Sequence, residues 1–186
     1  MTGDLQWAAQ DPLLQAYHDH EWGVPVHDDR QLFELLCLEG FQAGLNWLMV
    51  LKKRAALQAA FHGFDIDACA ALTDAKLAAL QQDPALIRNR LKISAVRANA
   101  QAVLRVQQEF GSFAAYLWGF VNGQPIVNRP QTAADIPTQT PLSQNIAADM
   151  KRRGFKFVGP VIIYSYLEGA GLIDDHLAGW QGTKAQ

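Results

Sequence analysis

Helix signals recur at short intervals along the whole chain, and apolar and polar residues do not alternate strictly over more than a few positions anywhere. A half-buried strand needs that alternation, whereas a buried helix face needs apolar residues three and four positions apart. Side chains that cap helix N-termini precede several apolar runs, and proline follows two of them: Asp11, Asp29, Thr73, Ser112 and Thr140. The sequence therefore predicts an all-α fold.

The expected helices cover most of the chain. They span about residues 12–18, 29–39, 45–61, 91–110, 112–120, 141–154 and 160–170, with two short helices after Asp65 and Thr73. Segment 121–140 carries three prolines and is the loop-like stretch. A chain of 186 residues, 49% hydrophobic, buries a real core, and we see neither repeats nor linkers. We expect residues 1–186 to form a single domain, loosely held from about residue 179.

The basic residues are unevenly placed. A formal charge of −2 argues against a polyanionic partner only if charges are spread evenly. Eleven of the 16 Lys and Arg residues fall in three clusters: Lys52, Lys53 and Arg54; Arg88, Arg90, Lys92 and Arg97; Lys151, Arg152, Arg153 and Lys156. A solvated face explains any one cluster, but three of them favour a nucleic-acid partner.

The two cysteines indicate a reducing compartment. Cys37 and Cys69 each lie in an apolar, helix-like run, where a buried thiol is more common than a disulfide. The first seven residues lack the pattern of a signal peptide, and no apolar stretch approaches the roughly 20 residues that span a bilayer. We expect a soluble, cytoplasmic protein that does not contact membranes.

Glu39 is the carboxylate in the least polar surroundings. It follows the apolar run 35–38 and precedes Gly40 and Phe41, so its side chain is expected to be mostly buried. A buried carboxylate needs a partner or keeps its proton. The residues alone favour a paired, structural glutamate over a functional one. Metal ligation has weak support, because the close pairs His18–His20 and His27–Asp28 lack the spacing of a zinc site.

Several separated blocks of the sequence carry a family resemblance. They are Tyr17-His18-Asp19-x-Glu21-Trp22-Gly23-Val24-Pro25, Leu38-Glu39-Gly40-x-Gln42-Ala43-Gly44-Leu45-x-Trp47, Leu51-Lys52-Lys53-Arg54, Ile87-Arg88-Asn89-Arg90, Phe120-Val121-Asn122, residues 151–159 and Gly171-Leu172-x-x-Asp175-His176. In this order, over nearly the whole chain, they resemble the DNA-3-methyladenine glycosylase I family.

The resemblance implies a helix-hairpin-helix DNA glycosylase fold, with compact helical lobes around a base-binding pocket. Such an enzyme flips 3-methyladenine out of alkylated duplex DNA and hydrolyses its N-glycosidic bond in base excision repair. Methylation at N3 makes the base cationic, so the pocket needs aromatic faces and a carboxylate more than a nucleophile. By resemblance, Glu39 is the catalytic residue, and four side chains bind the base: Tyr17, Trp47, Trp7 and Gln42. None of the lysines lies in the pocket motif, so we expect no Schiff base and no lyase activity.

The resemblance also places the DNA contacts. The hairpin would lie at about residues 83–92, and the DNA-binding side chains would be Arg88, Asn89, Arg90, Lys92, Lys151, Arg152, Arg153 and Lys156. Ala85 and Leu91 stand where the family commonly has glycine. We expect the protein to act on double-stranded DNA as a monomer, with a steep salt dependence of binding.

Zinc is the larger departure from the family. Members commonly join their termini through two cysteines and two histidines, and His18 and His176 match the histidines. Leu5 and Trp180 stand at the cysteine positions. Two ligands are too few for structural zinc, so we predict no metal and no cofactor, with Leu5 and Trp180 packed together instead.

Two other functions remain as alternatives. A non-catalytic, lesion-sensing DNA-binding protein would keep the scaffold, but it would not need Tyr17, Glu39, Gln42 and Trp47 together. A helical protein that binds a small purine without DNA would not need three basic clusters. An assay for release of free 3-methyladenine from alkylated DNA distinguishes the glycosylase from both of these alternatives.

Overall fold

The protein is helical, as expected, in a computed structural model that describes residues 6–182. The α-helices of this range are α1 (Pro12–His20), α2 (Asp29–Gln42), α3 (Trp47–Ala60), α4 (Ile66–Ala70), α5 (Asp74–Leu80), α6 (Arg90–Phe110), α7 (Phe113–Gly119), α8 (Pro141–Arg152) and α9 (Pro160–Gly169). Short 3-10 turns occur at Ala8–Gln10, His62–Phe64 and Ala133–Asp135. No helix in this part of the chain is long and apolar enough to cross a membrane.

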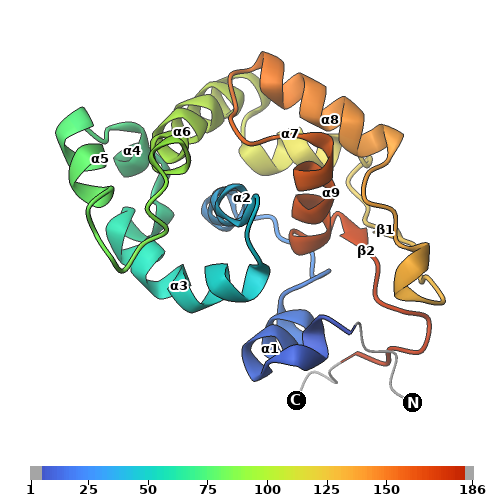
Figure 1. Ribbon diagram of the computed structural model, residues 1–186. Helices are drawn as coiled ribbons and strands as arrows, with labels where there is room; N and C mark the ends of the chain where they lie inside the picture. Colours follow the sequence, from blue (N-terminus) through green and yellow to red (C-terminus); the bar gives the residue numbers. More distant parts are fainter. Residues whose placement is uncertain (1–5, 183–186) are drawn as a thin grey trace.

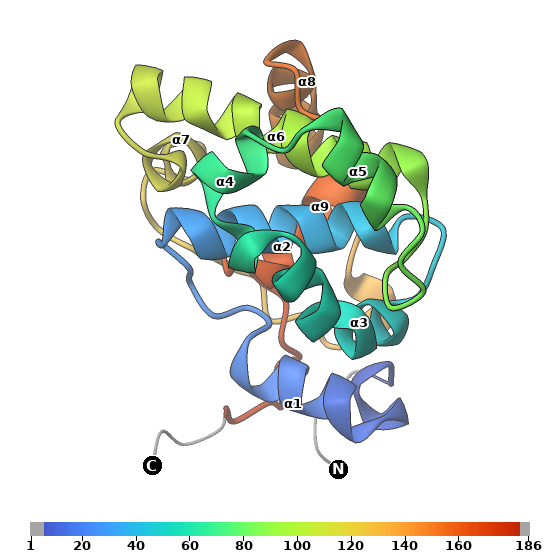
Figure 2. The same cartoon turned by 90° about the vertical axis from the view of Figure 1, so that its left-hand side faces the viewer.

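Helix α2 forms the centre of the molecule (Figure 1; Figure 2). Every residue from Leu32 to Phe41 is buried, because α3, α6, α7 and α9 all pack around this helix. A stripe of apolar residues was expected, but burial on all sides also encloses two carboxylates, Glu34 and Glu39. The carboxyl group of Glu39 therefore lies on a helix that is buried on all sides.

The helix starts follow their caps. Asp11, Thr73, Ser112 and Thr140 each accept a hydrogen bond from the backbone of the first turn, as predicted. Asp29 does not cap α2, because Asp28 accepts the bond from the Gln31 amide at 2.9 Å. The carboxylate of Asp29 instead binds the start of α7.

The segment between α5 and α6 forms the tight turn expected near residues 83–92. Asn89 caps α6 by accepting a hydrogen bond from the Lys92 amide at 3.1 Å. Lys53 of α3 donates to the carbonyl of Ala85 at 2.8 Å, so α3 holds the outer side of this turn. The turn is thus fixed by α3 on one flank and by the start of α6 at its end.

Segment 21–26 joins α1 to the end of α9. The Gly23 amide donates to the Glu168 carbonyl at 2.9 Å, and the Val26 amide donates to the Ala170 carbonyl at 3.0 Å. Gly171 has a φ of 72°, and a Cβ there would collide with the Val24 carbonyl group. A side chain at this position would push α1 away from α9.

The loop-like segment 121–140 contains a strand that the sequence did not predict. Strand β1 (Ile126–Val127) pairs in parallel with β2 (Ile173–Asp174), with Ile126 opposite Ile173. This two-residue ladder is too short to show an alternating pattern. It holds the loop beside the chain that follows α9.

Candidate active site

A cavity of about 690 Å³ opens between α1, the end of α2, the start of α3, the loop near residue 136 and α9. Its volume lies in the range of small-molecule pockets. Five aromatic side chains line it: Trp7, Tyr17, Trp22, Trp47 and Tyr164. All five side chains that the resemblance assigned to catalysis and base binding line this cavity: Trp7, Tyr17, Glu39, Gln42 and Trp47.

The aromatic walls come from three parts of the chain. Tyr17 of α1 lies 5.2 Å from Trp47, centroid to centroid, with the rings tilted by 56°. Trp7 lies edge-on to Trp22 at 5.7 Å. Asn46 caps α3 and so fixes Trp47 as the first residue of that helix. The Trp47 indole nitrogen is buried and has no hydrogen-bond partner among the described residues.

Glu39 presents an unpartnered carboxyl group to the cavity. The residue is 6% exposed, and no other side chain in the described part of the molecule donates a hydrogen bond to it. Burial raises the pKa of this carboxyl to about 8. A bound cation would stabilise its ionised form and lower the pKa again. The arrangement therefore suits a ligand that brings positive charge or hydrogen-bond donors.

Tyr17 brings a hydroxyl group close to Glu39. Burial, and next the charge of Glu39, raise the pKa of Tyr17 well above its ordinary value, so the hydroxyl keeps its proton. Gly169 of α9 makes room for both groups. A Cβ on Gly169 would lie 3.0 Å from the Tyr17 hydroxyl oxygen and 3.8 Å from Oε1 of Glu39.

The cavity also contains residues that sequence reasoning missed. Glu168, Tyr164 and Trp22 line it without having been assigned to it. Glu168 follows an apolar run, 161–167 interrupted only by Ser165, much as Glu39 follows 35–38. The same sequence signal could have found it.

The hairpin residues divide into two groups. Arg88, Asn89 and Arg90 are exposed. Lys92 is only 7% exposed, and its ammonium group donates to the carbonyls of Phe41, at 2.8 Å, and Ala43. The geometry does not fit the expected contact of Lys92 with phosphate, because this side chain fastens the first turn of α6 to the end of α2.

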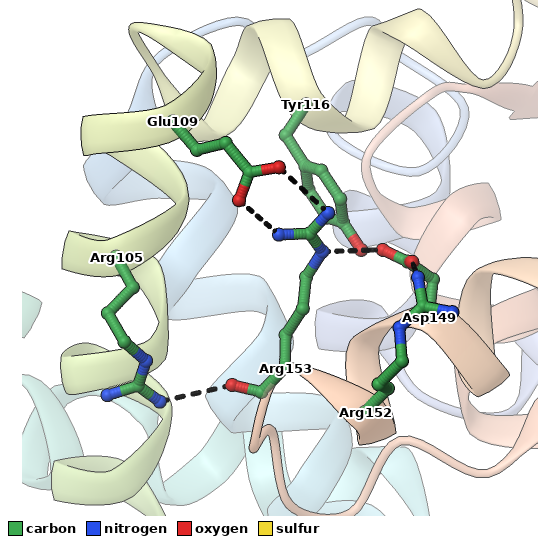
Figure 3. A network of polar contacts seen from close by, with 6 residues as sticks. All are labelled: Arg105, Glu109, Tyr116, Asp149, Arg152 and Arg153. Carbon is green, nitrogen blue, oxygen red and sulfur yellow. Dashed lines mark hydrogen bonds and ion pairs between the residues drawn. The ribbon is translucent and has the colours of Figure 1, made fainter.

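The third basic cluster is partly neutralised by ion pairs (Figure 3). Arg153 donates to Glu109 at 2.6 Å and to Asp149 at 2.7 Å, and Arg152 also pairs with Asp149. Lys151 and Lys156 are exposed and have no ion pair within residues 6–182. Of the four expected DNA contacts here, the two lysines carry the uncompensated charge.

The residues near the position where the family commonly binds zinc do not fit a tetrahedral metal site. Nδ1 of His18 lies 2.8 Å from Asp19, and Nδ1 of His176 lies 2.6 Å from Asp174. Trp180 stacks flat on His176 with centroids 3.5 Å apart. Nε2 of His18 is buried without a partner, but no three metal-ligating side chains of residues 6–182 converge on one point. Leu5 lies outside the described residues.

The fold and the cavity define a helical DNA glycosylase. Residues 7–181 match the family model for methyladenine glycosylase, and the chain belongs to that family. The resemblance and the fold class predicted from the sequence are thereby confirmed.

Individual relatives match over nearly their whole length. The chain is 48% identical over 173 residues to DNA-3-methyladenine glycosylase 1 of Escherichia coli (strain K12), covering 93% of this chain and 92% of the relative. It is 41% identical over 177 residues to DNA-3-methyladenine glycosylase of Haemophilus influenzae (strain ATCC 51907 / DSM 11121 / KW20 / Rd). The match covers 95% of this chain and 96% of that relative.

Solved structures show the same fold. A crystal structure of 3-methyladenine DNA glycosylase I matches with a TM-score of 0.92 at 48% identity, over 95% of this chain and 97% of that one. The Staphylococcus aureus enzyme, described for its recognition of 3-methyladenine, matches with a TM-score of 0.94 at 38% identity, over 100% and 99%.

Proposed function

We propose that the protein hydrolyses the N-glycosidic bond of 3-methyladenine in alkylated duplex DNA, with the 690 Å³ cavity as the base pocket and Glu39 as its catalytic carboxylate. The enzyme class follows from the family: the chain is a DNA-3-methyladenine glycosylase, a hydrolase of base excision repair. We propose the duplex substrate and the roles of the individual residues.

The unpartnered carboxyl of Glu39 is the observation that carries this assignment. The cavity contains no Lys, Arg or His among the described residues that line it, so none of these residues balances an ionised Glu39. A purine methylated at N3 supplies the missing positive charge. Glu39 therefore binds a cationic base more tightly than a neutral one.

The same charge explains why little further catalysis is needed. When the bond between C1′ and the base breaks, its electron pair moves to the base and cancels the positive charge. The base leaves as neutral 3-methyladenine, and water adds to C1′ and loses a proton. Glu39 holds and orients the cationic base before the bond breaks.

The aromatic side chains supply the rest of the recognition. Trp47 and Tyr17 can present ring faces to a flat cationic base, an interaction worth about 2 kcal/mol for a desolvated pair. No lysine is found among the described lining residues, which supports simple hydrolysis over Schiff-base chemistry.

The DNA contacts are proposed from the exposed basic residues. Arg88 and Arg90, with the capped start of α6, offer cations and backbone amides to the phosphates of the lesion strand. Lys151 and Lys156 add charge beyond the turn. We propose that the protein works as a monomer in the cytoplasm, which agrees with the two free, buried cysteines Cys37 and Cys69.

The test is release of the free base. Purified protein incubated with methylated duplex DNA is expected to release 3-methyladenine, measured by chromatography, and to leave an abasic site without cutting the strand. Unmethylated duplex is the control. Tight binding to methylated duplex without base release would instead establish a lesion-sensing protein, and strand cleavage at the site would contradict simple hydrolysis.

A further inference from the structure

A second carboxyl group, that of Glu168, lines the same cavity as Glu39. Glu168 lies in the last turn of α9 and is 9% exposed. Helix α9 packs directly on α2, so the two carboxyl groups reach the cavity from neighbouring helices. Burial, then Asp175 through its charge and a hydrogen bond, and then the charge of Glu39 raise the pKa of Glu168 well above its ordinary value.

Asp175 forms a hydrogen bond with Glu168 and does not itself line the cavity. Asp175 is fully buried, and its Oδ1 accepts a hydrogen bond from the Asn128 amide at 2.7 Å. Its Oδ2 accepts from the Tyr164 hydroxyl at 2.5 Å. Two carboxyl groups form a hydrogen bond only when one of them carries a proton. Two donors stabilise the negative form of Asp175, whereas no side chain of residues 6–182 is seen to donate to the Glu168 carboxyl, so the proton between the pair is assigned to Glu168.

No Lys, Arg or His of residues 6–182 lines the cavity beside Glu168. The titratable groups that face it are Glu39 of α2, Tyr17 of α1, Tyr164 of α9 and Asp175 after β2. Each of these is neutral or negative. An ionised Glu168 would therefore stand beside carboxylates in a buried site, which is costly.

We propose that Glu168 is a further residue of the base pocket and that it acts there as an uncharged carboxylic acid. Its hydroxyl donates to Asp175, and its carbonyl oxygen accepts a hydrogen bond from the base. This inference rests on the base pocket proposed above. One carboxylate, Glu39, then balances the one positive charge of the alkylated base, and Glu168 adds polar recognition without a second negative charge.

Two substitutions separate the polar role of Glu168 from its charge. Glu168→Gln keeps the shape, donates an amide N–H to Asp175 and leaves an oxygen for the base, whereas Glu168→Leu removes both polar groups. We expect kcat/KM for 3-methyladenine excision to fall about threefold at most in E168Q and at least about tenfold in E168L, the effect of removing one hydrogen bond. An equal loss in both variants would overturn the uncharged role, and wild-type kcat/KM in E168L would overturn the pocket role.

Infrared spectroscopy observes the proton directly and does not require a folded E168L. The difference spectrum between the unliganded wild type and E168Q at neutral pH should contain the carbonyl stretch of a protonated carboxylic acid. The same band should appear between E39Q and the double variant E39Q/E168Q. Glu109→Gln is the matched control without such a band, since Glu109 is an exposed carboxylate paired with Arg153. A carboxylate band in place of the acid band would overturn the proposal, whatever the enzyme excises.

Discussion

Glu39 and Lys92 are both buried ionisable residues, but only Lys92 has hydrogen-bond partners among the described residues, and the two residues have different roles. The ammonium group of Lys92 donates to the Phe41 and Ala43 carbonyls, where it closes the end of α2. Glu39, two residues before Phe41 in the same helix, has no such partner among the described residues and faces the cavity. A buried ionisable group that already has hydrogen-bond partners stabilises the fold, whereas one without partners is available to bind a ligand.

Glu39 is expected to make the protein less stable as the pH rises. Its pKa is raised from 4.5 to about 8 in the folded protein, so the unfolded chain releases this proton first. Below the unfolded pKa the glutamate has no such effect, and between pH 4.5 and about 8 it increasingly favours unfolding. Each unit of pKa difference is worth about 1.4 kcal/mol, so the effect amounts to a few kcal/mol.

The variant Glu39→Gln removes this titration. Its free energy of unfolding, measured with urea, should exceed that of the wild type at about pH 8.5 and approach it at about pH 5. A constant difference between the two proteins across this pH range would show that the carboxyl does not have a raised pKa in the fold.

The sequence predicts burial of Glu39 but not its lack of a partner. Burial follows from the apolar residues beside it, which is local information. Whether a donor reaches the carboxyl depends on α1, α3 and α9, which come from distant parts of the chain. The burial of Glu168 could have been predicted from the apolar run before it, but its interaction with Asp175 forms only in the folded structure.

Most helices could be predicted because their boundaries are set by local capping. Asp11, Ser112 and Thr140 start α1, α7 and α8 through bonds to amides two or three residues ahead. Strand β1 could not be predicted, because its pairing with Ile173 joins segments far apart in the chain. Asp29 shows a second limit, because its carboxylate reaches another helix rather than its own.

Asp29 is expected to stabilise the contact between α2 and α7. Its carboxylate accepts hydrogen bonds from the amides of Phe113, at 2.9 Å, and Ala114, at 2.8 Å, and from the Gln107 side chain at 2.7 Å. Asp29→Ala removes all three and should lower the free energy of unfolding by roughly 2–3 kcal/mol, measured with urea. The control Asp67→Ala, in the exposed first turn of α4, should change it by less than about 0.5 kcal/mol. Equal effects of the two substitutions would contradict this role of Asp29.

For the whole molecule, the net charge of −2 does not show that the basic residues fall into two groups, one in ion pairs and one exposed. Arg54 pairs with Glu21 and Glu34, and Arg153 with Glu109 and Asp149, so these basic residues join elements of the fold. Arg88 and Arg90 remain exposed beside the α6 N-terminus. Sequence clustering could not distinguish these groups, because the paired acids come from other elements.

This division predicts how DNA binding responds to salt. Replacing Arg88 and Arg90 with alanine should lower the slope of log affinity against log salt concentration by roughly one to two, about one for each phosphate that the protein no longer neutralises. Lys92→Met should leave the slope unchanged and lower stability instead, because Lys92 bonds within the fold. Fluorescence anisotropy at several salt concentrations measures the slope, and urea unfolding measures the stability. A slope reduced by Lys92→Met but not by the arginine substitutions would reverse the assignment.

We propose above that the unpartnered carboxylate of Glu39 binds the cationic base during excision. Single-turnover release of 3-methyladenine from methylated duplex DNA tests it most directly, with Glu39→Gln compared with the wild type and with Asp67→Asn as a surface control. We expect the excision rate to fall at least about tenfold in E39Q, the equivalent of about 1.4 kcal/mol, and to stay at the wild-type value in D67N. A wild-type rate in a folded E39Q enzyme would contradict the claim.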